Sequence, residues 1–152
     1  MKINSYNHRN GESVIPLNIQ NNIKEILMNI TSPITNKGAS KIRMQVVEKM
    51  HLDGWSENIR LTPSSHMTIT AMKDKIGACV QLGNVSRLYA DLMKLQTLFL
   101  RGSINAGIII VPEIEAAKEL GQNIANSVRL IKELQIFDTL ITMPLIIYGF
   151  DK

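Results

Sequence analysis

The chain has 152 residues and a formal net charge of +4, with 45% hydrophobic and 20% charged residues. This composition excludes wholesale disorder, and the length fits one domain. Cys79 is the only cysteine, which excludes an internal disulfide and favours a reducing compartment. The opening segment is polar, and no apolar run reaches about 18 residues. We therefore expect a soluble, cytoplasmic protein with no secretory signal and no contact with a membrane.

The first third of the sequence predicts a polar segment followed by two helices. Residues 1–15 are expected to form a polar N-terminal arm, and residues 16–152 a single domain. From Leu17 onward, apolar residues recur on one helical face until Ser32-Pro33 ends the pattern. A second amphipathic helical pattern follows and stops at Asp53-Gly54.

The next segment predicts strands. Residues 55–61 are expected to form a short strand. The runs Met67–Met72 and Ile76–Gln81 are rich in residues that favour strands, and only Lys73-Asp74-Lys75 separates them. Two such runs around a short polar link predict a β-hairpin with antiparallel strands.

The period then changes, and helices alternate with apolar strands. Residues 85–100 carry a strong helical pattern, and 106–111 form a continuous apolar run typical of a buried strand. A helical region at 113–137, interrupted near Gly121, leads to a last apolar strand at 140–150. A hairpin, a crossover helix and a buried strand predict a mixed sheet with helices packed on it. Many folds share that order, so a function has to be argued from a site.

Several short stretches occur in the order and spacing of a known family. They are Gly54-Trp55-Ser56, Ile76–Asn84, Ser86-Arg87, Asp91-Leu92, Lys94-Leu95 and Gly107–Pro112. Together they resemble the central block of BglII-type (BglII/BstYI-like) restriction endonucleases, over roughly residues 50–150. The resemblance implies a PD-(D/E)XK nuclease fold, which is an α/β (α+β) core with a mixed sheet flanked by helices.

The resemblance also implies where a catalytic centre would lie. In the family, a hairpin presents an Asp on one strand and a Glu-x-Gln on the next, and the two carboxylates hold the Mg²⁺ that activates water. Gln81 matches the Gln, and Asn84 matches an Asn beyond it. Cys79 occupies the Glu position and, by the spacing of the hairpin, Thr70 occupies the Asp position. The family's catalytic positions Thr70, Cys79 and Gln81 therefore lack both acids.

This loss bears directly on the cofactor. Mg²⁺ needs anionic oxygen ligands, whereas a Cys thiol is soft and mostly neutral and a Thr hydroxyl brings no charge. We expect Mg²⁺ as a cofactor only if the protein is active. Cys79 is more simply a small apolar residue of a buried strand. Candidate replacement ligands are Asp74, Glu57 and Glu48, although Asp74 also suits a turn.

Basic and amide side chains near these positions are candidates for contacts with DNA. The candidates are Lys73, Lys75, Asn84, Arg87 and Lys94. Solvated surface charge is the alternative for the cations, and strand-end or turn roles are the alternative for Gln81 and Asn84. Amide side chains suit phosphate or base-edge contacts, and the resemblance favours that role.

Three functions are compatible with the sequence. The first is a restriction-endonuclease-like protein that binds double-stranded DNA with weak or lost cleavage. The second is an active metal-dependent endonuclease with relocated carboxylates, and the third is a protein-interaction module on a nuclease fold. The resemblance further implies a symmetric homodimer. The chain holds little beyond the core, so segments that read bases in the major groove are expected to be reduced.

Overall fold

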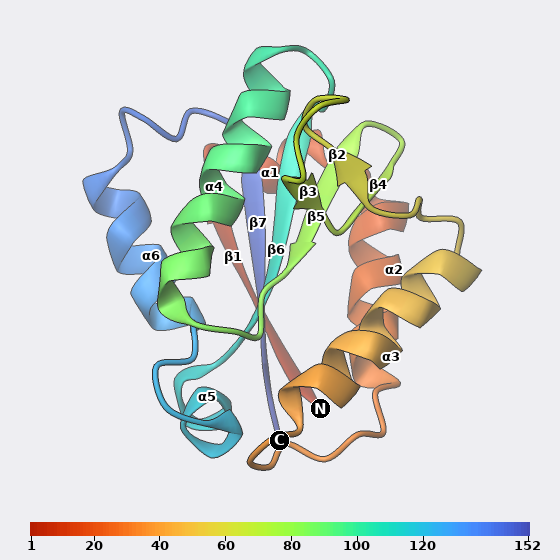
Figure 1. The fold of residues 1–152 in the computed structure, drawn as a ribbon, viewed down its shortest axis with the longest axis vertical. Coiled ribbons are helices and arrows are strands. Elements are labelled where there is room, and N and C mark those ends of the chain that lie inside the picture. The colour runs from red at the N-terminus through yellow and green to blue at the C-terminus, as the bar shows by residue number, and fades with distance from the viewer.

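A five-stranded mixed sheet organises the chain, and the computed structural model describes all residues 1–152 (Figure 1). In chain order the elements are β1 (Lys2–His8), α1 (Gly11–Val14), α2 (Leu17–Met28), α3 (Ala39–Leu52), β2 (Ile59–Arg60), β3 (Thr68–Ile69), β4 (Ala71–Lys73), β5 (Ile76–Val80), α4 (Val85–Leu100), β6 (Ala106–Pro112), α5 (Ile114–Leu120), α6 (Ser127–Ile136) and β7 (Leu145–Asp151). The strand order is β1-β7-β6-β5-β4, and β2 and β3 form a separate two-stranded sheet. None of the helices is long and apolar enough to cross a membrane.

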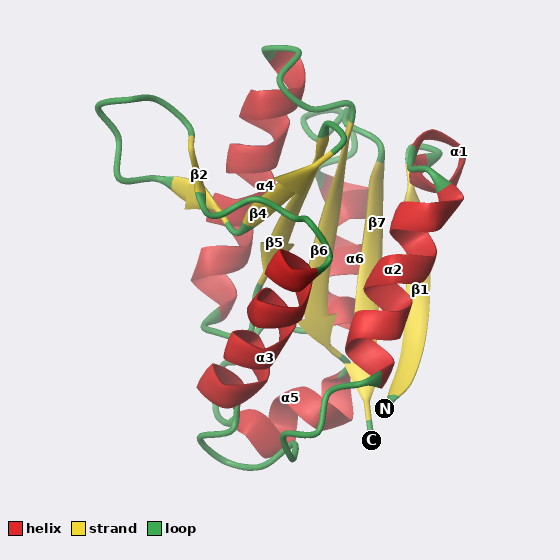
Figure 2. Ribbon diagram, turned by 90° about the vertical axis from the view of Figure 1, so that its right-hand side faces the viewer, coloured by secondary structure: helices red, strands yellow, loops and turns green.

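The centre of the sheet is parallel and is covered on both faces. β5, β6 and β7 pair in parallel, with Cys79 opposite Ile109 and Ile109 opposite Ile147. Helices α2 and α3 lie on one face of the sheet, and α4 and α6 lie on the other (Figures 1 and 2). Alternate residues of β6 enter the two cores: Ile108 and Ile110 join the α2–α3 side, and Ile109 the α4–α6 side. Burial on both faces explains the continuous apolar runs of these strands.

The predicted hairpin is confirmed, with one interruption. β4 and β5 pair antiparallel, with Ala71 opposite Ala78, and β6 belongs to the same sheet. The run 67–72 is not one strand, however. Thr68–Ile69 pairs with β2, whereas Ala71–Lys73 pairs with β5, so the chain changes sheets at Thr70. A period-2 pattern cannot reveal such a change, because both sheets accept the same alternation.

The expectation of a polar N-terminal arm at residues 1–15, separate from the domain, is wrong. Lys2–His8 forms the edge strand β1, antiparallel to β7, with Lys2 opposite Asp151. Backbone pairing and polar contacts hold this strand, because Asn4 and Tyr6 each donate a 3.0 Å hydrogen bond to Glu113 Oε1. Its polar composition therefore indicates a partly exposed edge strand, which apolar periodicity does not detect.

Two other expected strands are shorter than predicted. Of residues 55–61, only Ile59–Arg60 is a strand, and Trp55 packs into the core instead, with its Nε1 donating to Asn22 Oδ1 at 2.9 Å. The last strand begins at Leu145, since residues 140–144 are not in a strand. The helices at 85–100 and on either side of Gly121 are confirmed.

Candidate functional site

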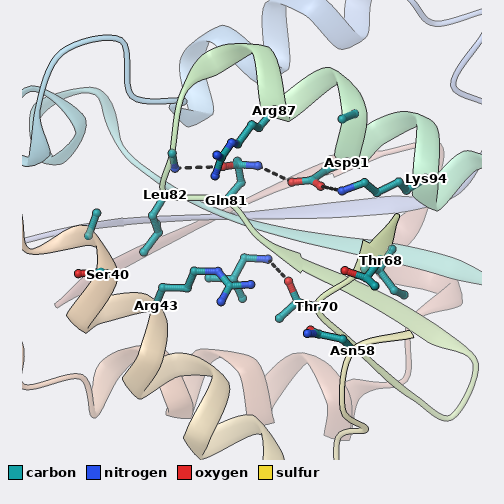
Figure 3. Close-up of a pocket in the computed structure, with 15 residues that line it drawn as sticks. Ser40, Arg43, Asn58, Thr68, Thr70, Gln81, Leu82, Arg87, Asp91 and Lys94 are labelled. Carbon is teal, nitrogen blue, oxygen red and sulfur yellow. Dashed lines mark hydrogen bonds and ion pairs between the residues drawn. The ribbon is translucent and has the colours of Figure 1, made fainter. Parts of the chain in front are cut away.

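A hollow of about 610 Å³ opens between α3 and α4, at the end of β5 (Figure 3). We call it the β5 pocket. Its polar lining residues are Ser40, Arg43, Asn58, Thr68, Thr70, Gln81, Arg87, Asp91 and Lys94. These residues come from both helices, from the β3–β4 junction, from the end of β5 and, for Asn58, from the loop that precedes β2.

Thr70 reaches the pocket because the chain changes sheets there. Its backbone N–H donates to Ala78 O at 3.0 Å, and its Oγ1 accepts from the backbone N–H of Val80 at 3.0 Å. These two bonds fix Thr70 against β5 and place it in the same pocket as Gln81. The juxtaposition expected from the family spacing is therefore present for Thr70 and Gln81.

Cys79 lies beside Thr70 but does not line the pocket. Its side chain is 1% exposed and belongs to the core between the sheet and α4. Burial raises the pKa of the Cys79 thiol, and the nearby Asp91 carboxylate raises it further. The thiol is therefore neutral at physiological pH and suits neither a metal ion nor a nucleophilic role. The interpretation of Cys79 as a buried apolar residue is confirmed.

A chain of hydrogen bonds links Gln81, Asp91 and Lys94 (Figure 3). Gln81 Oε1 accepts from the Gly83 N–H at 3.0 Å, and its Nε2 donates to Asp91 Oδ2 at 2.5 Å. Lys94 Nζ donates to Asp91 Oδ1 at 3.0 Å. Both carboxylate oxygens thus have partners, and the Gln81 amide is held at both ends.

Asp91 is the acidic residue of the pocket that the site prediction did not include. It is the one carboxylate among the side chains that line the β5 pocket. The sequence carried a signal for it, because Asp91 falls on the same helical face as the buried Leu88, Leu92 and Leu95. A charged residue on an apolar face needs a partner, and Lys94 at i+3 provides one.

Arg43 and Arg87 supply positive charge that no protein group neutralises. Both are exposed, and neither donates a hydrogen bond or forms an ion pair within the chain. With Lys94, the pocket presents three cationic side chains against the single carboxylate of Asp91. The site is therefore electropositive. Arg43 was not among the predicted DNA-binding residues, since the packing of α3 opposite α4 is not visible in the sequence.

Only two of the five predicted DNA-binding residues, Arg87 and Lys94, line the pocket. Lys73 Nζ donates to Asp53 O at 2.5 Å, and Lys75 lies in the β4–β5 turn with a positive φ of 61°. Asn84 caps α4, since its side chain accepts from the Ser86 N–H at 2.9 Å. None of these three residues lines the pocket, and Lys73 and Lys75 lie at the turn end of the β4–β5 hairpin, opposite to the end that contains Thr70 and Gln81.

The proposed replacement ligands also lie elsewhere. Asp74 is an exposed turn residue with a φ of 49°. Glu57 is 86% exposed and lies 3.6 Å from His51 Nδ1, and Glu48 lines a different hollow along α3. No three His, Cys, Asp or Glu side chains cluster as a metal site would require. One carboxylate already paired with lysine does not fit the oxygen-rich octahedral shell of Mg²⁺.

The sheet order, the flanking helices and the pocket at the end of β5 define a restriction-endonuclease fold. The structure is similar to a crystal structure of the restriction endonuclease BglII in complex with a DNA 16-mer, with a TM-score of 0.85 and 15% identity over 100% of this chain and 79% of that one. It is also similar to free BglII, with a TM-score of 0.79 and 16% identity over 100% of this chain and 80% of that one. No curated protein sequence matches the chain.

The sequence profile described as restriction endonuclease BglII/BglIII matches residues 3–150, and the chain belongs to that family. The match confirms the family suggested by the central motifs and extends it to β1 and to the helices α1, α2 and α3. The mixed α/β fold that the resemblance implied is confirmed as well.

Proposed function

We propose that this chain is a DNA-binding member of its family in which Mg²⁺-dependent phosphodiester cleavage is weak or lost. One observation carries the proposal. At the positions that the resemblance assigns to the two acids, Thr70 is neutral and Cys79 is buried, while Arg43, Arg87 and Lys94 line the pocket that contains Thr70. The charge pattern thus favours a phosphate over a divalent cation.

Electrostatics supports the binding part of the proposal. Cationic side chains that neutralise phosphates release counterions, which supplies most of the sequence-independent affinity for DNA. The relatives include a structure in complex with DNA, which is consistent with duplex DNA as the partner. Chemistry supports the second part, because a metal ion would have to supply both the activated water and charge neutralisation.

A second candidate function is an active endonuclease with a rearranged centre. The observation in its favour is Asp91, a buried carboxylate within the pocket. It stands alone there, and Lys94 competes for it. A third candidate, an interaction module that has lost DNA binding, has no specific feature in its support.

We also propose that the protein is a cytoplasmic homodimer. Apolar side chains are exposed on the neighbouring helices α4 and α6: Met93 is 60% exposed, Leu100 72% and Ile136 74%. Such a surface suits a two-fold contact between copies. A single buried Cys79 suits a reducing compartment. Sedimentation that shows only monomer at micromolar concentration would contradict the dimer.

Two measurements on the purified protein test the proposed function. Duplex binding at several salt concentrations should give a steep negative dependence of log affinity on log salt. Incubation of plasmid DNA with Mg²⁺ or Mn²⁺ should give little or no nicking. Efficient metal-dependent cutting that Asp91→Asn abolishes would instead establish the active endonuclease.

A further inference from the structure

We propose that the β5 pocket holds one backbone phosphate directly between Arg43 and Arg87, with no metal ion between protein and phosphate. This inference rests on the proposed function, since it specifies how the chain engages DNA. It assigns to the two arginines the charge neutralisation that a metal ion would otherwise supply.

The two arginines approach the pocket from opposite walls. Arg43 extends from α3 toward Thr70 and the end of β5, and Arg87 lies alongside Gln81 from α4 (Figure 3). A guanidinium presents five N–H donors in a planar fork that matches two oxygens of a phosphate. Two such forks facing one pocket suit a tetrahedral dianion or a diester monoanion.

Both guanidinium groups are available for a ligand. Three other arginines of the chain are engaged: Arg9 with Asp138, Arg101 with Leu61 O, and Arg129 with Glu133. Arg60 is exposed and unpaired, but it does not line the pocket. Arg43 and Arg87 have no such partner. Their donors therefore point into a concave polar site and are satisfied there only by solvent or by a ligand.

The surrounding groups favour an anion. Asp91 is the one negative charge, and Lys94 Nζ lies 3.0 Å from it with only 20% of the lysine side chain exposed. This pair largely cancels, so the two unpaired guanidinium groups dominate the field in the pocket. Neutral Thr70 and buried Cys79 add no repulsion toward a phosphate. The same charges disfavour entry of a divalent cation.

The first test measures duplex binding by fluorescence anisotropy in the presence of EDTA. Arg43→Gln and Arg87→Gln should each weaken binding by about tenfold, as expected when a charge-assisted hydrogen bond is removed. Lys132→Gln is the matched control, because Lys132 is an exposed cation of α6 that lies outside the pocket.

The double arginine variant should also lower the salt slope by about 1 for each phosphate that the protein no longer neutralises. Lys118→Gln with Lys132→Gln is the matched double control.

The second test uses inorganic phosphate and does not depend on DNA. Phosphate should raise the Tm of the wild type, because a ligand that binds only the folded state stabilises it. The double arginine variant should lose this shift while keeping the Tm of the wild type in phosphate-free buffer. Chloride at equal ionic strength is the control for a general salt effect.

The outcomes distinguish a failure of the two-arginine phosphate site from a failure of DNA binding itself. If the wild type binds DNA and the arginine variants bind as tightly as the lysine controls, the inference is overturned and DNA binding stands. If the wild type binds no duplex yet is stabilised by phosphate, the proposed function is overturned, and so is a DNA phosphate as the ligand. An affinity that requires Mg²⁺ and falls with Asp91→Asn would show metal-mediated contact and overturn the inference.

Discussion

The Oγ1 of Thr70 accepts a hydrogen bond from the backbone N–H of Val80 at 3.0 Å, so the residue that the resemblance places at the Asp position is attached to β5, which contains Cys79 and leads to Gln81. The backbone thus fixes Thr70 against β5, although the Cys79 side chain faces the core beside α4 and not the pocket. What differs is the charge. The geometry and the chemistry of this site can therefore be tested separately by substitution.

Restoring both acids should restore metal binding. In the variant Thr70→Asp with Cys79→Glu, we expect the longer Glu side chain to extend from the core toward the new Asp, and calorimetry should detect binding of Mg²⁺ or Mn²⁺. Each single variant should bind far more weakly, because groups that act as one unit are strongly non-additive. Cys79→Glu alone should also lower stability by about 1–3 kcal/mol or more, since it buries an unpaired acid. A single variant that binds metal as tightly as the double variant would contradict this prediction.

Asp91→Asn should have opposite effects on stability and on DNA affinity. It should lower the free energy of unfolding by about 1–2 kcal/mol, because Lys94 and Gln81 lose a charged acceptor. Removal of a negative charge from the pocket should at the same time strengthen duplex binding severalfold. Urea unfolding and anisotropy measure the two effects. Asp138→Asn changes an exposed acid outside the pocket and should change neither stability nor DNA affinity by much. Weaker DNA binding by Asp91→Asn would count against an electropositive pocket.

Tyr148→Phe should stabilise the protein, most clearly at alkaline pH. The Tyr148 hydroxyl is buried and has no hydrogen-bond partner, so its removal should raise the free energy of unfolding by about 1 kcal/mol. Burial raises the pKa of Tyr148 above its ordinary value of 10.0. When the pH rises above about 10, the unfolded chain loses the Tyr148 proton while the folded protein keeps it. The free energy of unfolding of the wild type therefore falls as the pH rises through this range. Thermal unfolding between neutral and alkaline pH should show a smaller loss for Tyr148→Phe than for the wild type.

Tyr89→Phe serves as the matched control for that substitution. The Tyr89 hydroxyl donates to Glu133 Oε1 at 2.6 Å, so its removal should destabilise rather than stabilise. Equal effects of the two substitutions would refute the distinction between an unpaired and a paired hydroxyl.

Gly149→Ala should destabilise the protein through Glu113. A Cβ at position 149 would collide with the Glu113 carboxylate, which accepts hydrogen bonds from Asn4, Tyr6 and Ser127. Displacing a buried carboxylate from three donors should cost about 2–4 kcal/mol. In a Glu113→Ala background the same glycine substitution should cost much less, because the obstacle is gone. Thermal unfolding of the four proteins of this cycle tests the coupling, and additive effects would exclude it.

The sequence predicted those elements whose apolar pattern is local. Helix α4 was placed correctly because its repeat is strong, Asn84 caps its start and Arg101-Gly102 ends it. β6 was placed correctly because a continuous apolar run before Pro112 has few other interpretations. β1 was missed because its strand conformation depends on pairing with the distant strand β7 and not on an apolar periodicity of its own.

The site was only partly predictable for a related reason. Motif spacing located Thr70, Cys79 and Gln81, and the pocket contains the first and last of them. Arg43 and Asn58 reach it through tertiary packing, which no spacing encodes. Asp91 was within reach of a helical-face argument, because it lies among the buried leucines of α4.

The pairing of β1 with β7 also has a consequence for synthesis on the ribosome. β1 is synthesised before its partner β7, with every other strand of the sheet in between, so β1 stays unpaired until β7 has been made. A strand with open backbone groups can pair with another nascent chain, and an apolar strand would do so readily. The sequence of β1, Lys-Ile-Asn-Ser-Tyr-Asn-His, is instead mostly polar. The polar composition that hid this strand from periodicity analysis thus leaves an unpaired β1 with little apolar surface for pairing with another nascent chain.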